Sequence, residues 1–182
     1  MEMVAASDVA DFFIEEFKDS EDPMTKVRIQ KFLYFAQAES LVRLHRPLFN
    51  EDFQAWHYGP VIPSISSQFM NLKDGEMISS PINKMDIHKF KPEEIEILMD
   101  VSTYCGRYST TELSNKTHVD GGPWHSVHVE EGAPAIISKR SIEEFYSSHE
   151  LIPHYFSNVV SSLPVEGRVD DNGKFLLTTD WE

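Results

Sequence analysis

The alternation of hydrophobic and polar residues predicts a mainly helical protein built around one long helix. Residues 29–36 read IQKFLYFA and are apolar around most of a helical circumference, a pattern typical of a helix that neighbours contact on several sides. We expect this helix to span about residues 25–44 and to end before Pro47, because proline cannot continue a helix. Its predicted core residues are Phe32, Leu33 and Ala36.

Signals for helix starts and ends predict at least five helices in total. Ser7-Asp8 has the character of an N-cap pair, and the boxes 109–112 and 141–144 each place a Glu three positions after a capping Ser. Pro63 and Pro92 each begin a further predicted helix, and we expect these two helices to end at Gly75 and Gly106. Besides the long helix, the predicted starts are Ser7, Pro63, Pro92, Ser109 and Ser141.

Extended structure is predicted near the middle of the chain and near its end. Residues 53–58 alternate in polarity and favour a short strand, followed by a rigid turn at 58–63 (YGPVIP), where two prolines and a glycine restrict the backbone. The sequence DNG at 171–173, between two short apolar runs, predicts a β-hairpin or an added strand. The remaining expectations are a connecting loop at 76–91, a loop rich in Gly and His at 117–135, and a final helical piece at 153–160.

Length and composition favour one compact helical domain with a short appendage. The 182 residues are 41% hydrophobic and include one cysteine, Cys105, so the core is expected to need no disulfide. We assign residues 1–158 to the helical domain and residues 159–182 to a C-terminal extension. The first residues lack the features of a secretory signal, and no stretch approaches the ~18 apolar residues that a membrane span requires. We therefore expect a cytoplasmic protein with no membrane partner.

The net charge of the chain limits the kinds of partner that it is expected to bind. Its 16 Lys and Arg against 30 Asp and Glu leave a net charge of −14. Such a surface repels phosphate backbones, which disfavours nucleic acid as a partner, and it attracts basic proteins. A local basic patch and a homo-oligomer are both compatible with the sequence.

The histidines and the cysteine are the candidates for chemistry, and each has a plainer interpretation. Three histidines lie close together in one predicted loop, but their spacing matches no established zinc motif, and packing histidines are the default. These are His118, His125 and His128, with Asp120 nearby. Cys105 precedes a glycine at a predicted helix end, where a small buried hydrophobe is commoner than a nucleophile. We find no nucleotide-binding glycine loop and no nucleophile elbow, and we assign no catalytic residue, metal or cofactor.

Three segments carry a family resemblance. Residues 29–38 read IQKFLYFAQA, residues 47–63 contain PLF and then FQAWHYGPVIP, and residues 108–124 contain YSTTELS, TH and PW. Their order and approximate spacing resemble those of the Panacea domain, the SocA/GepA-like family of phage-associated and toxin–antitoxin-associated proteins. The resemblance covers about residues 5–150.

The resemblance implies a mostly helical domain and an antitoxin function. Members of this family are regarded as antitoxins that neutralise a toxin encoded beside them through direct protein contact. The implied partner is therefore a cognate protein toxin, which the chain either masks or presents to a protease. An alternative is a phage or mobile-element protein that binds and regulates a host protein. A metal-dependent enzyme is a third class, which no motif in the chain favours.

Several residues of these motifs have both a structural and a binding interpretation. Gln30 and Lys31 lie in the most apolar part of the long helix, where polar side chains require partners. In the structural interpretation, Lys31 snorkels or bonds helix C-terminal carbonyls, and Gln30 satisfies a turn. In the binding interpretation, both residues, with Tyr34, Trp56 and Tyr58, surround one groove that receives a partner segment. Aromatic anchors contribute most of the binding energy of many interfaces, so we predict a contact surface with an aromatic centre and an acidic rim. The partner-binding candidates are Lys31, Tyr34, Trp56, Tyr58, Pro60 and Trp124.

Overall fold

The computed structural model describes residues 3–130, 134–149 and 151–156, together with two short strands at 167–169 and 175–177. Within these residues the chain is mainly helical, as the sequence predicts. The α-helices are α1 (Ala6–Phe17), α2 (Lys26–Leu44), α3 (Pro63–Gln68), α4 (Pro92–Cys105), α5 (Thr110–Thr117), α6 (Pro123–Glu130) and α7 (Lys139–Ser147). The strands are β1 (Phe53–Trp56), β2 (Gly59–Val61), β3 (Ile136–Ile137), β4 (Gly167–Val169) and β5 (Phe175–Leu177), and a 3-10 helix, η1, spans Ile87–Lys89.

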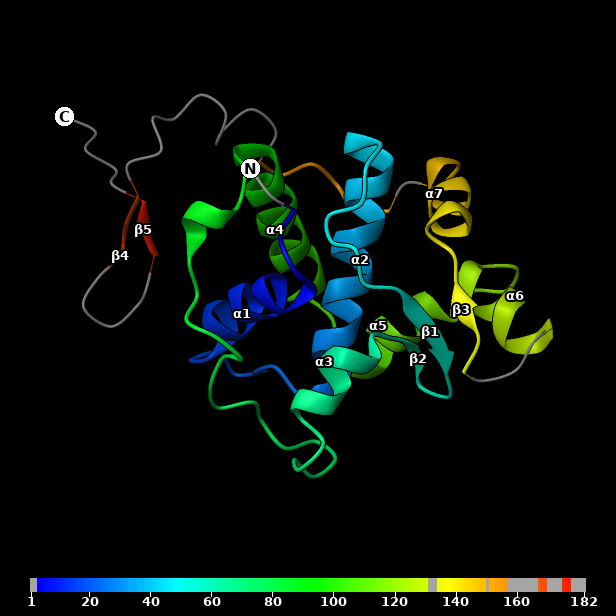
Figure 1. Cartoon of the computed structure of the whole chain (residues 1–182), viewed down its shortest axis with the longest axis horizontal. Coiled ribbons are helices and arrows are strands. Elements are labelled where there is room, and N and C mark those ends of the chain that lie inside the picture. Colours follow the sequence, from blue (N-terminus) through cyan, green and yellow to red (C-terminus); the bar gives the residue numbers. More distant parts are fainter. Residues whose placement is uncertain (1–2, 131–133, 150, 157–166, 170–174, 178–182) are drawn as a thin grey trace.

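Helix α2 runs through the centre of the molecule (Figure 1). All residues from 28 to 41 are buried, because α1, α3, α4, α5 and α7 all contact this helix. Thr25 begins the helix by accepting a hydrogen bond from the Arg28 amide, and His45 ends it in the left-handed conformation, with φ +52°. The predicted long helix and its three predicted core residues are confirmed. No described helix is both long and apolar enough to cross a bilayer.

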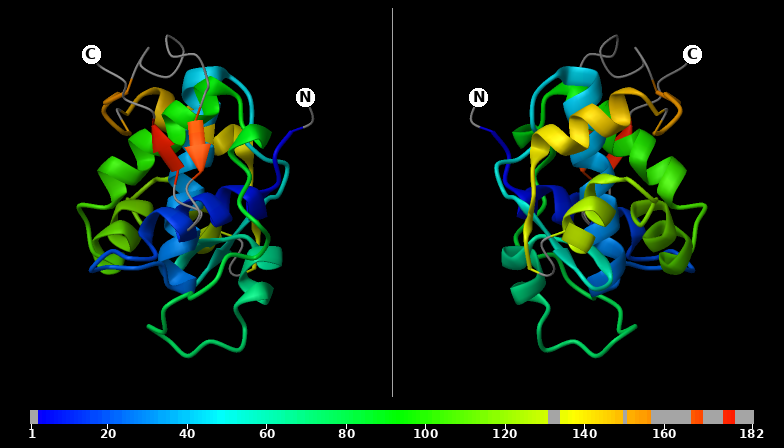
Figure 2. Two further views of the ribbon diagram at one scale, coloured as in Figure 1. Left: turned by 90° about the vertical axis from the view of Figure 1, so that its left-hand side faces the viewer. Right: turned by 90° about the vertical axis from the view of Figure 1, so that its right-hand side faces the viewer.

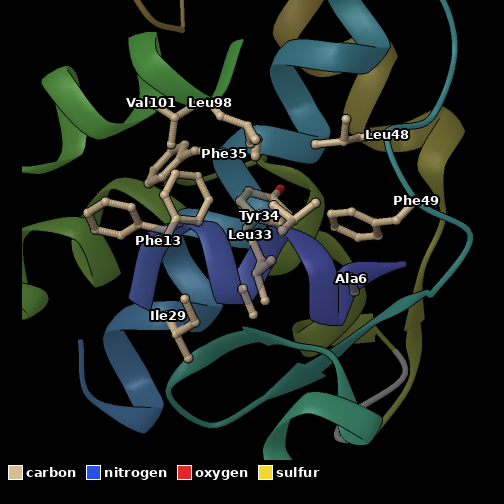
Figure 3. Packing of buried hydrophobic residues seen from close by; sticks show 14 of the residues in the cluster. Ala6, Phe13, Ile29, Leu33, Tyr34, Phe35, Leu48, Phe49, Leu98 and Val101 are labelled. Atoms are coloured by element: carbon tan, nitrogen blue, oxygen red, sulfur yellow. The ribbon is translucent and has the colours of Figure 1, made fainter. Parts of the chain in front are cut away.

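The core forms where α1 and α4 pack on one side of α2 and β1 packs on another (Figure 3). Phe13 of α1 meets Phe32 of α2 edge to face, with ring centroids 5.1 Å apart. Tyr34 meets Phe53 of β1 in the same way, with centroids 5.3 Å apart. Aromatic pairs of this kind contribute ~0.5–1.5 kcal/mol beyond the area they bury. They fix the first helix and the sheet against the same central helix.

Three strands form an antiparallel sheet in the order β2-β1-β3. Strands β1 and β2 make a hairpin in which Trp56 pairs with Gly59, so His57 and Tyr58 are its two-residue turn. The predicted strand therefore ends at Trp56, two residues early. The rigid turn predicted after Tyr58 is wrong, because residues 59–61 form strand β2. Gly59 adopts φ +106°, which lets the chain reverse directly after the turn.

Two predicted helix starts are wrong by a few residues. Helix α1 begins at Ala6, before the predicted cap, because the Asp8 carboxylate lies in the first turn and accepts a hydrogen bond from the Ala5 amide at 3.0 Å. Helix α7 begins just after Ser138, whose hydroxyl accepts a hydrogen bond from the Ser141 amide at 3.0 Å. In both cases the first turn contains a polar residue of a type that often caps helices, but the actual N-cap residue lies three positions earlier.

The other predicted starts, of α3, α4 and α5, are confirmed, whereas one predicted helix end and two predicted loops need correction. Helix α3 ends at Gln68, well before Gly75, and turns follow it. The predicted loop 76–91 contains η1, which begins where the Asp86 carboxylate accepts a hydrogen bond from the His88 amide. The predicted loop 117–135 contains α6, which begins at a proline, a residue preorganised for a first helical turn.

The segment after α7 is not helical where it is described. Asp100 of α4 holds it, because its Oδ1 accepts hydrogen bonds from the amides of Tyr155 and Phe156 at 2.7 and 3.0 Å. Arg43 of α2 pairs with the other oxygen of Asp100 at 2.6 Å. The helix predicted at 153–160 is thus wrong for residues 153–156, and its remainder lies outside the described residues. Strands β4 and β5 pair antiparallel, as the predicted hairpin requires.

Candidate partner-binding groove

A groove of about 1110 Å³ opens beside the N-terminal half of α2. Its walls come from α2, the β1–β2 hairpin, α3 with the segment after it, and α5. Figure 1 shows these elements gathered around the lower end of α2, and Figure 2 shows the segment after α3 extending from the same end of the molecule. Four separate parts of the sequence therefore build one concave surface.

Gln30 and Lys31 of α2 hold the hairpin through its backbone. The Gln30 side-chain oxygen accepts a hydrogen bond from the Ile62 amide at 2.8 Å, and Lys31 Nζ donates to the Tyr58 carbonyl. Both side chains are buried, and a buried backbone group that lacks a partner costs ~1–3 kcal/mol. Gln30 therefore satisfies the backbone of the turn region, as its structural interpretation predicts. Lys31 bonds a carbonyl of the hairpin turn and not the helix C-terminal carbonyls that we expected, and it also lines the groove.

Gln37, two helical turns after Gln30, forms similar hydrogen bonds to the backbone of the segment before β1, and the sequence analysis did not predict them. Its Oε1 accepts a hydrogen bond from the Leu48 amide at 2.8 Å, and its Nε2 donates to the Phe49 carbonyl at 2.9 Å. The side chain is fully buried. A glutamine within an otherwise apolar helix was the available signal, since such a residue needs partners.

The hairpin and α2 approach each other most closely at Gly59. A Cβ atom at this position would lie 2.2 Å from Lys31 Nζ, and 3.0 Å from both His118 Nε2 and Thr117 Oγ1. Two atoms that are not bonded to each other cannot lie 2.2 Å apart, so either the new methyl group or the Lys31 ammonium would have to move. Together with φ +106°, this crowding makes glycine the residue that the position requires.

Burial also sets the protonation of the polar groups beside Gly59. It lowers the pKa of Lys31 to about 7, because an ammonium loses hydration in an apolar surrounding. Burial, and then the neighbouring charge of Lys31, lowers the pKa of His118 to about 4. At neutral pH the His118 ring is therefore uncharged, and Lys31 is poised between its two protonation states.

Trp124 supports the hairpin through its indole ring. Its Nε1 donates a hydrogen bond to the Trp56 carbonyl at 2.9 Å. The rings of His118 and His128 stack on the indole, with centroids 3.8 and 4.6 Å away. The PW segment of the third motif is thus packed against the AW segment of the second.

The residues that invited a catalytic or metal interpretation are dispersed. His118 and His128 stack on one indole, whereas the His125 ring lies 3.6 Å from the Asp120 carboxylate. Within the described ranges, no three His, Cys, Asp or Glu side chains are placed to hold a metal ion. Cys105 is fully buried, and burial raises the pKa of its thiol, so it packs as a small hydrophobe.

The structure brings half of the six partner-binding candidates together. Those that line the groove are Lys31, Trp56 and Tyr58. Those that are buried outside it are Tyr34, Pro60 and Trp124. Trp56 and Tyr58 are 37% and 67% exposed, whereas Tyr34 is 0% exposed and lies in the core (Figure 3). We therefore restrict the contact surface to the first three and to the residues around them.

Helix α5 contributes a polar wall that the sequence analysis did not foresee. Thr110, Thr111, Ser114 and Asn115 all line the groove. Three of them belong to the YSTTELS segment of the third motif, and a capping box starts this helix, but neither signal indicated a groove wall. Met70, which is 74% exposed, extends the apolar side of the groove.

The lining of this groove is not acidic, whereas the sequence predicts an acidic rim around the contact surface. Among the described residues that line it, Asp74 is the single acid, and this carboxylate pairs with Lys26 at 2.7 Å. The other acidic residues of the described part of the chain do not line this groove.

The part of the chain that forms most of the central helix, the hairpin and the groove walls matches a known protein family. Residues 29–125, more than half of the chain, match the family described as Antitoxin SocA-like, Panacea domain, and the chain belongs to this family. It is similar to Antitoxin SocA of Caulobacter vibrioides (strain NA1000 / CB15N), with 32% identity over 136 residues, which cover 66% of this chain and 69% of that protein. No solved structure shows significant similarity to the chain. Family membership supports an antitoxin role.

Proposed function

We propose that this chain is an antitoxin that neutralises a cognate toxin by binding it directly through the groove beside α2. The observation that carries the proposal is the pair of exposed aromatic side chains, Trp56 and Tyr58, on a hairpin that buried hydrogen bonds hold in place. Aromatic side chains dominate the energy of many interfaces. A surface that is already rigid loses little entropy when it binds.

The lining of the groove favours a protein segment as its occupant. Its volume of about 1110 Å³ lies near the upper end of the range of about 300–1,000 Å³ for small-molecule sites, so the lining, and not the size, distinguishes the two kinds of occupant. Its lining combines aromatic and sulfur-containing side chains on one side with the hydroxyl and amide groups of α5 on the other. Protein interfaces have the same combination of an aromatic centre and polar surroundings.

Two mechanisms of neutralisation follow from such binding. If the chain masks the toxin, the toxin accumulates as an inactive complex. If the chain presents the toxin to a protease, the amount of toxin falls when the antitoxin is expressed. Immunoblotting of a tagged toxin with and without the antitoxin separates the two mechanisms.

Co-expression with the toxin-like gene nearest to this one tests the proposal. The wild-type chain should restore growth, and Tyr58→Ala should weaken rescue, because loss of an interface anchor costs ~2 kcal/mol or more, roughly thirtyfold in affinity. Val129→Ala is the matched control, since Val129 is also 67% exposed but lies on α6, outside the groove. Abundance and melting temperature are measured for each variant.

Three results would count against the proposal. Equal rescue by wild type, Tyr58→Ala and Trp56→Ala would place the contact surface elsewhere, with residues 159–182 next to be tested. A lower melting temperature and abundance of Tyr58→Ala would assign that residue a structural function. Failure of the wild-type chain to protect against the neighbouring gene product would favour a host protein as the partner.

A further inference from the structure

Lys31 is a buried amine that lacks a counter-ion when it is protonated. Its side chain is 0% exposed, and the acceptor of its ammonium is the Tyr58 carbonyl. Among the described residues, no carboxylate forms an ion pair with it, and desolvation alone shifts its pKa. Buried charges in proteins are normally paired with an opposite charge, because an ammonium without one loses several kcal/mol of hydration.

The position of this cation directs attention to the groove. Lys31 lines the groove although its side chain is 0% exposed, so it forms part of the floor, with its ammonium against the Tyr58 carbonyl. His118 also lines the groove; its Nε2 atom is buried and makes no hydrogen bond of good geometry in the described part of the chain, although the Tyr58 backbone acts on the pKa of the ring as a weak partner. Two polar groups that converge on Gly59 thus keep unused hydrogen-bonding capacity beside an open space.

The charge of the groove differs in sign from that of the whole chain. Its charged lining residues are Lys26, Lys31 and Asp74, and the pairing of Lys26 with Asp74 leaves the charge of Lys31 uncompensated. The net charge of the chain is −14. An acidic segment is therefore disfavoured by most of the surface but is complementary to this floor.

We propose that the groove receives an acidic segment of the toxin, with one Asp or Glu carboxylate paired with the Lys31 ammonium and the aromatic side chains of Trp56 and Tyr58 packed over that segment. This inference rests on the proposed antitoxin function, and it specifies the chemistry of the partner. The carboxylate accepts a hydrogen bond from a proton of Lys31 that is not directed at the Tyr58 carbonyl. His118 in its Nε2–H tautomer donates a second hydrogen bond to the same group.

The test uses the toxin identified by the rescue assay, purified with a substitution that inactivates it. Calorimetry measures the affinity of this toxin for the chain. Lys31→Met should weaken binding at least tenfold, because it removes the charge and keeps the apolar chain. Gln37→Met is the matched control, since it removes buried hydrogen bonds of the same helix outside the groove without any charge, and it should change affinity less than threefold. One Asp→Asn or Glu→Gln substitution in the toxin should weaken binding to the wild-type chain, but not to Lys31→Met.

A spectroscopic measurement on the unmutated chain keeps the inference testable if Lys31→Met fails to fold. The chain labelled with ¹³C at the lysine ε carbons is titrated alone and in the complex. Lys31 should titrate near pH 7 when free and remain protonated above pH 9 when bound, because a paired carboxylate stabilises the ammonium.

The outcomes separate this inference from the proposed function. If the toxin binds, and Tyr58→Ala weakens the complex, but Lys31 titrates at the same pH free and bound, the inference is overturned and the proposed function stands. Equal affinity of the wild-type chain and Lys31→Met has the same meaning. If the wild-type chain does not bind the toxin at all, the proposed function fails, and the inference fails with it.

Discussion

The crowding at Gly59 yields the sharpest prediction about stability. In the variant Gly59→Ala, the new methyl group would lie 2.2 Å from Lys31 Nζ, so the ammonium must leave the Tyr58 carbonyl. The variant residue would also keep φ near +106°, where side chains with a Cβ atom are strained. The substitution thus combines a conformational effect with a steric one.

The expected loss follows from these two effects. A positive φ costs an L-residue ~1–2 kcal/mol. Displacement of Lys31 removes a hydrogen bond from a charged donor, which contributes ~1.5–3 kcal/mol. Gly59→Ala should therefore lower the free energy of unfolding by about 3–5 kcal/mol. For a domain of this size, that loss corresponds to a decrease in Tm of roughly 6–20 °C.

Urea denaturation followed by circular dichroism measures this loss. Gly75→Ala is the matched control, because Gly75 has φ +78° but nothing lies within 4 Å of the Cβ position. It should lose only the conformational part, ~1–2 kcal/mol, and the entropy change of the unfolded chain is the same in both variants. Equal losses in Gly59→Ala and Gly75→Ala would refute the view that the hairpin is packed directly against the Lys31 ammonium.

Three further predictions concern α2 and the end of the chain. Gln37→Met should lower the free energy of unfolding by about 2–5 kcal/mol, because the Leu48 amide and the Phe49 carbonyl lose their buried hydrogen-bond partner. The control Gln54→Met loses only an exposed hydrogen bond and should change the urea midpoint little. The pKa of Lys31 is lowered to about 7 from 10.5, so above pH 7 the unfolded chain binds a proton that the folded chain lacks, and stability should rise by about 1–2 kcal/mol from pH 7 to 8.5. Denaturation at both pH values checks this, and Lys31→Met should lack that contribution; an unchanged dependence on pH would contradict it. A chain that ends at Ser162 should unfold at the same urea concentration as the full chain, and insolubility would show that residues 159–182 are needed for folding.

The parts of the fold that the sequence predicts are those that depend on local pattern. Helix α2 was predictable because residues 29–36 are apolar around most of the helical circumference, and α4 because a proline opens it and acidic residues occupy its first turn. The start of α7 was not, because Ser138 and Ser141 are both good caps and packing of the chain decides between them. Helix α6 was missed because its glycine- and histidine-rich surroundings have the composition of a loop.

The candidate site was predictable only as far as its motifs extend. Trp56, Tyr58 and Lys31 belong to the motifs and do line one groove. Tyr34 and Trp124 belong to the same motifs, but one points into the core and the other supports the hairpin, a difference that the motifs do not encode. The wall formed by α5 depends on how that helix packs against α2, which is set by contacts between residues far apart in the chain.

The hydrogen bonds from α2 to the hairpin have a consequence for how the binding surface can diverge. Gln30 and Lys31 hold the hairpin through its backbone atoms, and the side chains of Trp56 and Tyr58 take no part in those bonds. Exposed residues of the groove can therefore be exchanged without loss of the frame that presents them. A family that keeps the frame and varies the exposed side chains can acquire new partners by single substitutions, while each intermediate remains folded.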